Sequence, residues 1–334
     1  MSRPRAVEAG LTFVRALHDA SFDDRMARLQ GLLAPGATWW IDTGRDRAAG
    51  VRGHDPGDAR PWPLHGQWPV EDKLRAVARV AAEIFPTGVG ARISSRAFGT
   101  DELALVEAEG DGLHVSGKRY RNRYAFVFDV SDEGITSIRE YLDTLHAEDV
   151  FGGDRLSVRT VAPRPVPPDP PVVGANDVER AALAPWPAFA RGDLDGFAAC
   201  FAPGATWWTD SGTDRDRGAF DRSGGPADGW PFHGVLPMDE KLDYIRRRMA
   251  EGYGGSTIEV TPVRCFSEGG LVAVEAEGYA ALANGRVYQN RYVLVNEVGP
   301  DGIVQLREYC DTLHVADATG VVAPTTTDEG EPTA

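Results

Sequence analysis

Apolar and polar residues alternate along Tyr120–His146, and nearly the same stretch of sequence returns at Tyr288–His314. Each stretch holds one alternating run, a turn containing acidic residues and glycine, and a second alternating run. This pattern predicts two antiparallel β-strands joined by a short hairpin, with successive side chains on opposite faces. One face of the first strand then carries four side chains: Asn122, Tyr124, Phe126 and Phe128.

The second strand of this hairpin places a carboxylate among apolar side chains. Glu140 shares its face with Ile138 and Leu142. A carboxyl group buried in apolar surroundings has a raised pKa, which suits it to proton transfer. We therefore expect Glu140, and Glu308 at the same place in the second copy, to act as acid/base residues.

The two hairpins belong to a longer internal repeat. Pro35–His146 aligns without a gap to Pro203–His314 at a constant shift of 168 residues, and roughly two positions in five are identical. Such a repeat indicates a duplication and two similar folds. The copies differ at positions that change the expected shape of the interior: His114 against Leu282, Phe128 against Asn296, and Ala76 against Tyr244.

Each copy is predicted to begin with helices and to continue with strands, which is an α+β arrangement with helices on one face of a curved mixed or antiparallel sheet. Periodicity predicts helices at Ala6–Leu17, Arg25–Leu33, Glu71–Phe85 and from about Asp177, and strands near Pro35–Gly44, Ala91–Phe98 and Leu103–Glu109. We expect module 1 at residues 1–152, a Pro-rich linker at 153–174, module 2 at 175–318 and a disordered tail at 319–334.

Composition excludes several functional classes. The chain has 334 residues and a formal net charge of -15, with no basic stripe, so we expect no nucleic-acid partner. No apolar run reaches membrane-spanning length, which favours a soluble cytoplasmic protein without a membrane partner. The cysteines do not repeat between the copies, so the sequence supports neither a repeated disulfide nor a zinc site, and we expect no metal: Cys200, Cys265 and Cys310.

The motifs WWIDTG, VEAEGDG, YRNRY and IREYLD, in this order, resemble the NTF2-like superfamily. That superfamily includes ketosteroid isomerase, SnoaL-type cyclases, limonene epoxide hydrolase and the phenazine-biosynthesis A/B proteins, and the likeness is greatest to the last group. The resemblance implies a cone-shaped cavity between sheet and helices in each module. It also implies that the acid/base Glu of the phenazine proteins corresponds to Glu140 and Glu308. A histidine on a helix of those proteins would fall near Val77 and Ile245 in this chain.

Further carboxylates are candidates for the same cavity. Asp42 shares a strand face with Trp40, although an Asp-Thr-Gly segment also caps loops. In limonene epoxide hydrolase the active-site positions correspond to Glu107, Glu109 and Glu140, but its Arg is missing here. If these carboxylates converge, like charge keeps at least one protonated; the alternative is a solvated edge of the sheet.

Polar and aromatic residues are candidates for binding a substrate. Asn122 and Tyr124 can donate hydrogen bonds to an oxyanion, or can serve only in cross-strand packing. His65 lies in a Trp-Pro-x-His-Gly loop that either closes over the cavity mouth or forms a turn. Asp143 is expected to be structural and to pair with Arg139 or Arg123.

The sequence thus predicts two tandem NTF2-like modules packed as an intramolecular pseudo-dimer, with further self-association left open. We expect a cofactor-independent acid/base enzyme for a small, largely apolar metabolite; the alternatives are a non-catalytic binding protein and an interaction scaffold. The predicted catalytic residues are Glu140, Glu308, Asp42, Asp210, Glu109 and Glu277. The predicted substrate-binding residues are Asn122, Asn290, Tyr124, Tyr292, Trp40, Trp208, His65, His233 and Leu142.

Overall fold

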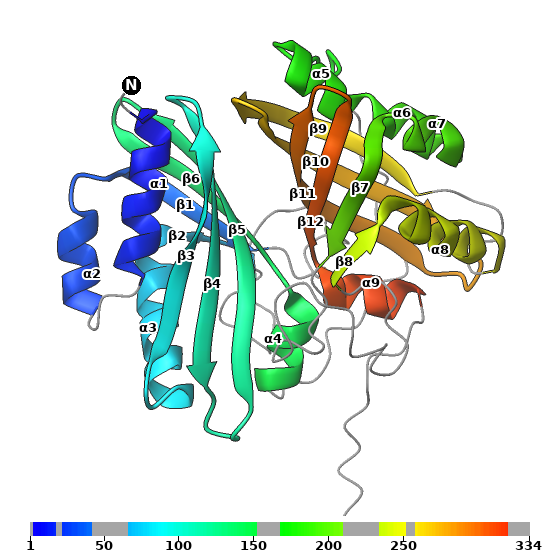
Figure 1. Ribbon diagram of the computed structural model, residues 1–334. Helices are drawn as coiled ribbons and strands as arrows, with labels where there is room; N and C mark the ends of the chain where they lie inside the picture. The colour runs from blue at the N-terminus through cyan, green and yellow to red at the C-terminus, as the bar shows by residue number, and fades with distance from the viewer. Residues whose placement is uncertain are drawn as a thin grey trace, which may run out of the picture.

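The computed structural model describes residues 3–17, 22–41, 66–151, 168–209, 234–251 and 258–319. These residues form two modules of the same design (Figure 1). Most of the predicted linker and nearly all of the tail lie outside the described residues. Four candidate site residues also lie outside them: Asp42, Asp210, His65 and His233.

The first module runs from α1 to α4. Its elements are α1 (Arg5–Ala16), α2 (Phe22–Leu29), β1 (Leu33–Ile41), β2 (Gly66–Pro69), α3 (Val70–Ile84), β3 (Val89–Gly99), β4 (Leu103–Leu113), β5 (Arg119–Ser131), β6 (Gly134–Leu142) and α4 (Thr144–Phe151). The apolar stripe that predicts the first helix is the face that α1 buries: Val7, Leu11 and Val14.

The second module repeats this order, with its opening helix divided. Its elements are α5 (Asp177–Leu183), α6 (Pro185–Ala190), α7 (Leu194–Ala198), β7 (Phe201–Thr209), β8 (Gly234–Pro237), α8 (Met238–Glu251), β9 (Glu259–Glu268), β10 (Leu271–Ala281), β11 (Val287–Gly299), β12 (Gly302–Cys310) and α9 (Thr312–Thr319). Asn176 caps α5 by accepting the Glu179 backbone N–H at 2.9 Å, as expected at a helix N-terminus.

Each module contains a six-stranded mixed sheet. The strand order is β2-β1-β6-β5-β4-β3 in the first and β8-β7-β12-β11-β10-β9 in the second. β1 runs parallel to β6, whereas its pairing with β2 is antiparallel. The predicted hairpin is β5 and β6, with Phe126 opposite Glu140. Its turn requires glycine, because Gly134 has a φ of +117° and a Cβ there would lie 2.4 Å from the Leu32 carbonyl oxygen.

One face of each sheet packs against the helices of its own module, and Figure 1 shows those helices on the outer sides of the molecule. The opposite faces pack against each other. A buried apolar cluster joins the two sheets there: Trp40, Phe98, Leu105, Ala125, Val127, Tyr141, Trp208, Phe266, Ala273, Val293, Val295 and Tyr309. The modules therefore form an intramolecular pseudo-dimer, and the prediction of two tandem α+β modules is confirmed.

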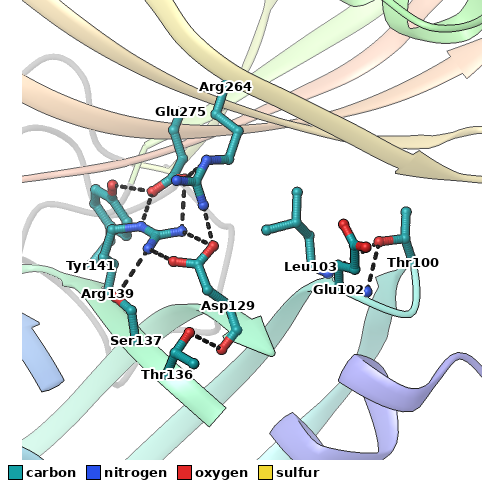
Figure 2. A network of polar contacts seen from close by, with 10 residues as sticks. All are labelled: Thr100, Glu102, Leu103, Asp129, Thr136, Ser137, Arg139, Tyr141, Arg264 and Glu275. Atoms are coloured by element: carbon teal, nitrogen blue, oxygen red, sulfur yellow. Dashed lines mark hydrogen bonds and ion pairs between the residues drawn. The ribbon is translucent and has the colours of Figure 1, made fainter. Parts of the chain in front are cut away.

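A polar network with the same pseudo-symmetry surrounds this cluster. Figure 2 shows its first half, in which Arg139 binds Glu275 through Nε at 2.6 Å and also binds Asp129. Tyr141 donates to the same Glu275 carboxylate at 2.8 Å. Burial opposes the charge of Arg139, but the two carboxylates outweigh that cost and raise its pKa. The second half uses Arg307, whose Nε lies 2.7 Å from Glu107.

Two helix N-termini also fasten the modules together. Thr144, the first residue of α4, donates to the Asp311 carboxylate at 2.5 Å and accepts the Leu313 backbone N–H at 3.0 Å. Thr312, the first residue of α9, donates to Asp143 and accepts a backbone N–H in return. Asp143 accepts hydrogen bonds from this threonine and from the His146 backbone N–H of its own helix, contacts that support the predicted structural role.

Among the described residues, no helix is both long enough and apolar enough to cross a membrane.

Candidate functional site

The predicted acid/base residues face the helix side of each sheet, and each accepts a hydrogen bond from a tryptophan indole. Trp39 Nε1 donates to Glu140 Oε2 at 2.7 Å. Trp207 Nε1 donates to Glu308 Oε2 at 2.8 Å. Both contacts follow from register, because β1 and β6, and likewise β7 and β12, are adjacent parallel strands. Each module thus fixes one carboxylate against a tryptophan indole on the helix side of its sheet.

A buried lysine accompanies each carboxylate. Lys73 on α3 is fully buried and places its Nζ 4.8 Å from the centre of the Trp39 ring. Lys73 Nζ makes no hydrogen bond within the part of the chain that the structure describes. Burial raises the pKa of Glu140 to about 7, although Lys73 and Trp39 oppose this rise. Burial also lowers the pKa of Lys73 to about 7, although Glu140 favours its charged form.

In the second module a threonine connects the lysine to the carboxylate. Lys241 Nζ donates to Thr209 Oγ1 at 3.0 Å, and Thr209 Oγ1 donates to Glu308 Oε2 at 3.1 Å. Burial lowers the pKa of Lys241 to about 8, with Glu308 opposing the change. The first module has Ile41 at the position of Thr209, so the hydroxyl link belongs to the second module.

The second module also contains a cavity of about 80 Å³ beside this group, which is enough for several water molecules or a small organic group. Glu308 lines it and is only half-buried. The other lining residues are mostly aromatic and aliphatic: Trp186, Phe189, Trp207, Thr209, Lys241, Ile245, Arg248, Ile258, Val260, Tyr288, Tyr292, Leu294, Cys310, Thr312 and Val315. This arrangement matches the usual character of a small-molecule site, an apolar wall with a few polar groups.

Aromatic rings pack together on the helix-facing side of the first sheet. Phe126 and Phe128 have their ring centres 6.3 Å apart, and Phe13 contacts both Phe128 and Trp39 edge-on. Glu140 is 6% exposed beneath them. Phe126 corresponds to Leu294, which lines the cavity, so a smaller aliphatic side chain stands there in place of an aromatic ring.

Two tyrosines place hydroxyl groups at the cavity wall. The Tyr288 and Tyr292 hydroxyl groups are hydrogen-bonded to each other, and Asn290 Nδ2 donates to the Tyr288 oxygen at 3.3 Å. Burial raises the pKa of Tyr292 well above its ordinary value, so this phenol keeps its proton. Gly278 makes room for it, because a Cβ at that position would lie 2.7 Å from the Tyr292 ring. In the first module the hydroxyl groups of Tyr120 and Tyr124 are hydrogen-bonded in the same way, with their oxygens 2.7 Å apart.

The predicted convergence of three carboxylates is wrong. Val106 pairs with Phe126, which pairs with Glu140, so these three share one face and Glu107 points to the other. Glu109 lies on that other face too and binds Arg123 Nε at 3.3 Å. In the second module Glu277 binds Arg291 Nε in the same way, at 3.2 Å.

Trp40 and Trp208 do not lie on the sheet face that carries Glu140 and Glu308. Both rings lie in the cluster between the sheets. The ring centres of Trp40 and Tyr141 are 5.7 Å apart, and those of Trp208 and Tyr309 are 5.0 Å apart. The preceding residue of each pair, Trp39 or Trp207, is the one that faces the carboxylate. The prediction that Trp40 and Trp208 face the cavity is therefore wrong: the neighbouring residues Trp39 and Trp207 lie on that face of the sheet.

Asn122 and Asn290 each make two hydrogen bonds to the backbone of the aspartate that precedes the last helix of their module. Asn122 Nδ2 donates to the Asp143 carbonyl oxygen at 2.9 Å, and its Oδ1 accepts the Asp143 backbone N–H at 3.2 Å. Asn290 makes the same two bonds to Asp311. Both amides thus fix the start of the following helix. Leu142 is buried in an apolar cluster of the first module, whereas its counterpart Cys310 lines the cavity.

The buried lysines Lys73 and Lys241 are not among the site residues predicted from the sequence. Lys73 corresponds to Lys241, and each lies one residue before a leucine on the apolar side of an amphipathic helix. A charge that recurs at the same buried position in both copies was a usable signal. The nearby Arg248 has no equivalent charge in the first module, where the position is Val80.

Each module places helices over one face of a mixed sheet and directs a carboxylate toward those helices. A family model described as a SnoaL-like domain matches residues 180–306. This match lies within the second module, and the first module repeats its strand order. The predicted resemblance to the NTF2-like superfamily is confirmed, and the narrower resemblance to the phenazine-biosynthesis proteins stays a prediction.

Solved structures of similar proteins each cover one module. An NTF2-like protein of unknown function from Burkholderia pseudomallei is 20% identical, with 42% of this chain and 96% of that chain covered and a TM-score of 0.34. A protein from Catenulispora acidiphila with a ketosteroid isomerase-like fold, in complex with trimethylamine, is 13% identical, with 42% and 92% covered and a TM-score of 0.31. An NTF2-like protein from Burkholderia thailandensis is 21% identical, with 43% and 97% covered and a TM-score of 0.33. No curated protein matches the chain.

Proposed function

We propose that the second module is a cofactor-independent acid/base enzyme for a small, largely apolar molecule. Isomerisation, dehydration, cyclisation and condensation are the reaction types that a single proton-transferring carboxylate can serve. The observation that carries the proposal is the position of Glu308, which lines an apolar cavity together with Lys241 and Tyr292.

Each polar group has a role that its contacts support. Glu308 removes a proton from a carbon atom next to a carbonyl group and returns it elsewhere on the molecule. The Tyr292 phenol, which burial keeps protonated, donates a hydrogen bond to the carbonyl oxygen as it gains negative charge. Lys241, linked to Glu308 through Thr209, balances the carboxylate charge without touching the substrate.

The first module keeps the carboxylate and the lysine but has the aromatic rings of Phe126 and Phe128 where the second has Leu294 and Asn296. We therefore place turnover in the second module. Glu140 and Lys73 form a buried polar pair of the first module, which serves the pseudo-dimer as a structural half.

The test uses 5-nitrobenzisoxazole, a generic probe for a base in an apolar pocket. Removal of its C–H proton opens the ring N–O bond and releases a coloured phenolate. Glu308→Gln should lower the rate by at least about 100-fold, the usual contribution of a positioned general base. Glu277→Gln is the matched control, because this carboxylate of the same module faces the other side of the sheet and binds Arg291.

Unchanged turnover in the Glu308→Gln variant would refute the assignment. Binding of the probe to the wild-type protein without turnover would instead favour the alternative, a non-catalytic binding protein with the same cavity.

A further inference from the structure

Arg248 gives the cavity a charged end that the first module lacks. Its side chain lines the cavity, and its Nε is buried without a hydrogen-bond partner among the described residues. One terminal nitrogen donates to the Thr319 carbonyl oxygen at 3.3 Å. An arginine N–H that is buried and unpaired costs free energy, so the free protein holds a donor that a bound acceptor would satisfy.

The position of Arg248 on α8 separates it from the proposed chemistry. Lys241, Ile245 and Arg248 are spaced at i, i+4 and i+7, so they lie along one face of the helix, and all three line the cavity. Seven residues of α-helix rise about 10 Å. The apolar Ile245 lies between the two cations, which leaves an apolar section of cavity between Arg248 and Glu308.

Charge within the cavity also favours an anion. The described lining residues include two cations, Lys241 and Arg248, and one carboxylate, Glu308. Since Glu308 is already linked to Lys241 through Thr209, the charge of Arg248 is the one left for a ligand. The chain as a whole carries a net charge of -15, so preference for an anion would come from this local group and not from the overall field.

From the cavity, the unpaired Nε and the absence of this arginine from the duplicate position, we propose that the ligand of the second module is a small carboxylic acid. Its carboxylate binds Arg248, and an apolar segment of about one ring connects it to the carbon beside Glu308. A guanidinium is well suited to this role, because its N–H groups match the geometry of a carboxylate. The inference deepens the proposed function and shares its site.

The test measures binding at equilibrium, so it stands apart from any test of turnover. The probes are phenylacetate and cinnamate, each compared with its neutral amide of the same shape, by isothermal titration calorimetry at physiological salt. In the wild-type protein at least one carboxylate should bind about tenfold or more tighter than its amide. Arg248→Met should abolish that preference, and Arg248→Lys should keep part of it.

Arg247→Met is the matched control, because it removes an exposed positive charge from the same helix without changing the cavity lining. Its preference for the carboxylate should equal that of the wild type. Equal affinity for carboxylate and amide in the wild-type protein, absence of carboxylate binding, or equal effects of the two methionine substitutions would each overturn the inference. Turnover of 5-nitrobenzisoxazole by a protein that ignores carboxylates would leave the acid/base proposal standing while this one fails.

Discussion

Trp39 donates its indole N–H to Glu140 across two parallel strands, and 168 residues later Trp207 does the same to Glu308. The duplicated contact places the same carboxylate in two different surroundings. In the first module aromatic rings pack beside it, whereas in the second a cavity opens beside it. Both modules therefore retain the tryptophan–carboxylate contact, and the cavity described here lies beside Glu308 in the second module.

The first prediction concerns the pH dependence of stability through Lys73. Because burial holds the pKa of Lys73 near 7, below its ordinary value, the unfolded chain binds more protons than the folded one above pH 7. Stability from this group therefore rises as pH increases from 7 toward its unfolded pKa of about 10.5. Glu140 acts oppositely: its raised pKa makes stability fall as pH increases from about 4.5 to 7.

Lys73→Met should change this profile in a defined direction. Without the lysine charge the pKa of Glu140 rises further, so the fall in stability continues above pH 7 while the wild-type protein recovers. Urea unfolding at pH 5, 7 and 9 measures the difference. Parallel curves for the two proteins between pH 7 and 9 would show that Lys73 and Glu140 do not share a buried environment.

The second prediction concerns the reciprocal contact of α4 and α9. Thr144→Val removes a buried donor to Asp311 and leaves the Leu313 backbone N–H without its acceptor, so it should cost about 1–3 kcal/mol in the free energy of unfolding. Thr312→Val should cost a similar amount, because its contacts mirror these. Urea denaturation provides the measurement.

Thr136→Val is the control for these substitutions. Thr136 is exposed and donates only to a backbone carbonyl oxygen, so its loss should change stability by less than about 0.5 kcal/mol. If all three valine variants unfolded alike, the threonine contacts between the modules would contribute nothing measurable.

The third prediction concerns the shape of the cavity. Leu294→Phe restores the ring that the first module carries at Phe126, so it should fill part of the cavity and lower turnover of 5-nitrobenzisoxazole at least tenfold, with stability kept or increased. The reverse change in the first module, Phe126→Leu, should leave turnover unchanged and cost roughly 1–2 kcal/mol of stability. Equal turnover of Leu294→Phe and wild type would mean that the reaction occurs elsewhere.

Much of the fold could be predicted because its signals are local. Alternation along β5 and β6 identifies the hairpin, and the constant shift between copies identifies two modules. The face of Glu140 also follows from alternation, since its neighbours Ile138 and Leu142 are apolar.

Which side chains of different strands share a face of the sheet could not be predicted in the same way. Glu107 and Glu140 lie on different strands, and a slip of one residue in pairing exchanges the two faces. Only the observed pairing of Val106 with Phe126 settles that Glu107 points toward the other module. Adjacent tryptophans pose the same problem, because alternation sends Trp39 and Trp40 to opposite faces without saying which face holds the carboxylate.

The role of Asn122 depended on contacts distant in sequence. Alternation places it on the same face as Tyr124, which is correct, but its amide is used by the backbone of Asp143. No sequence pattern distinguishes an amide that binds a ligand from one that holds a chain reversal. Lys241, by contrast, could have been found, since its repetition at Lys73 on an apolar helix face was visible in the sequence.

The central claim is that the second module, through Glu308, performs the proton transfer. The most direct measurement compares the rate of 5-nitrobenzisoxazole ring opening by Glu308→Gln and by Glu140→Gln, the same substitution in the two copies. We expect a loss of at least about 100-fold for Glu308→Gln and a rate within about twofold of wild type for Glu140→Gln. Equal rates for the two variants, or a loss confined to Glu140→Gln, would contradict it.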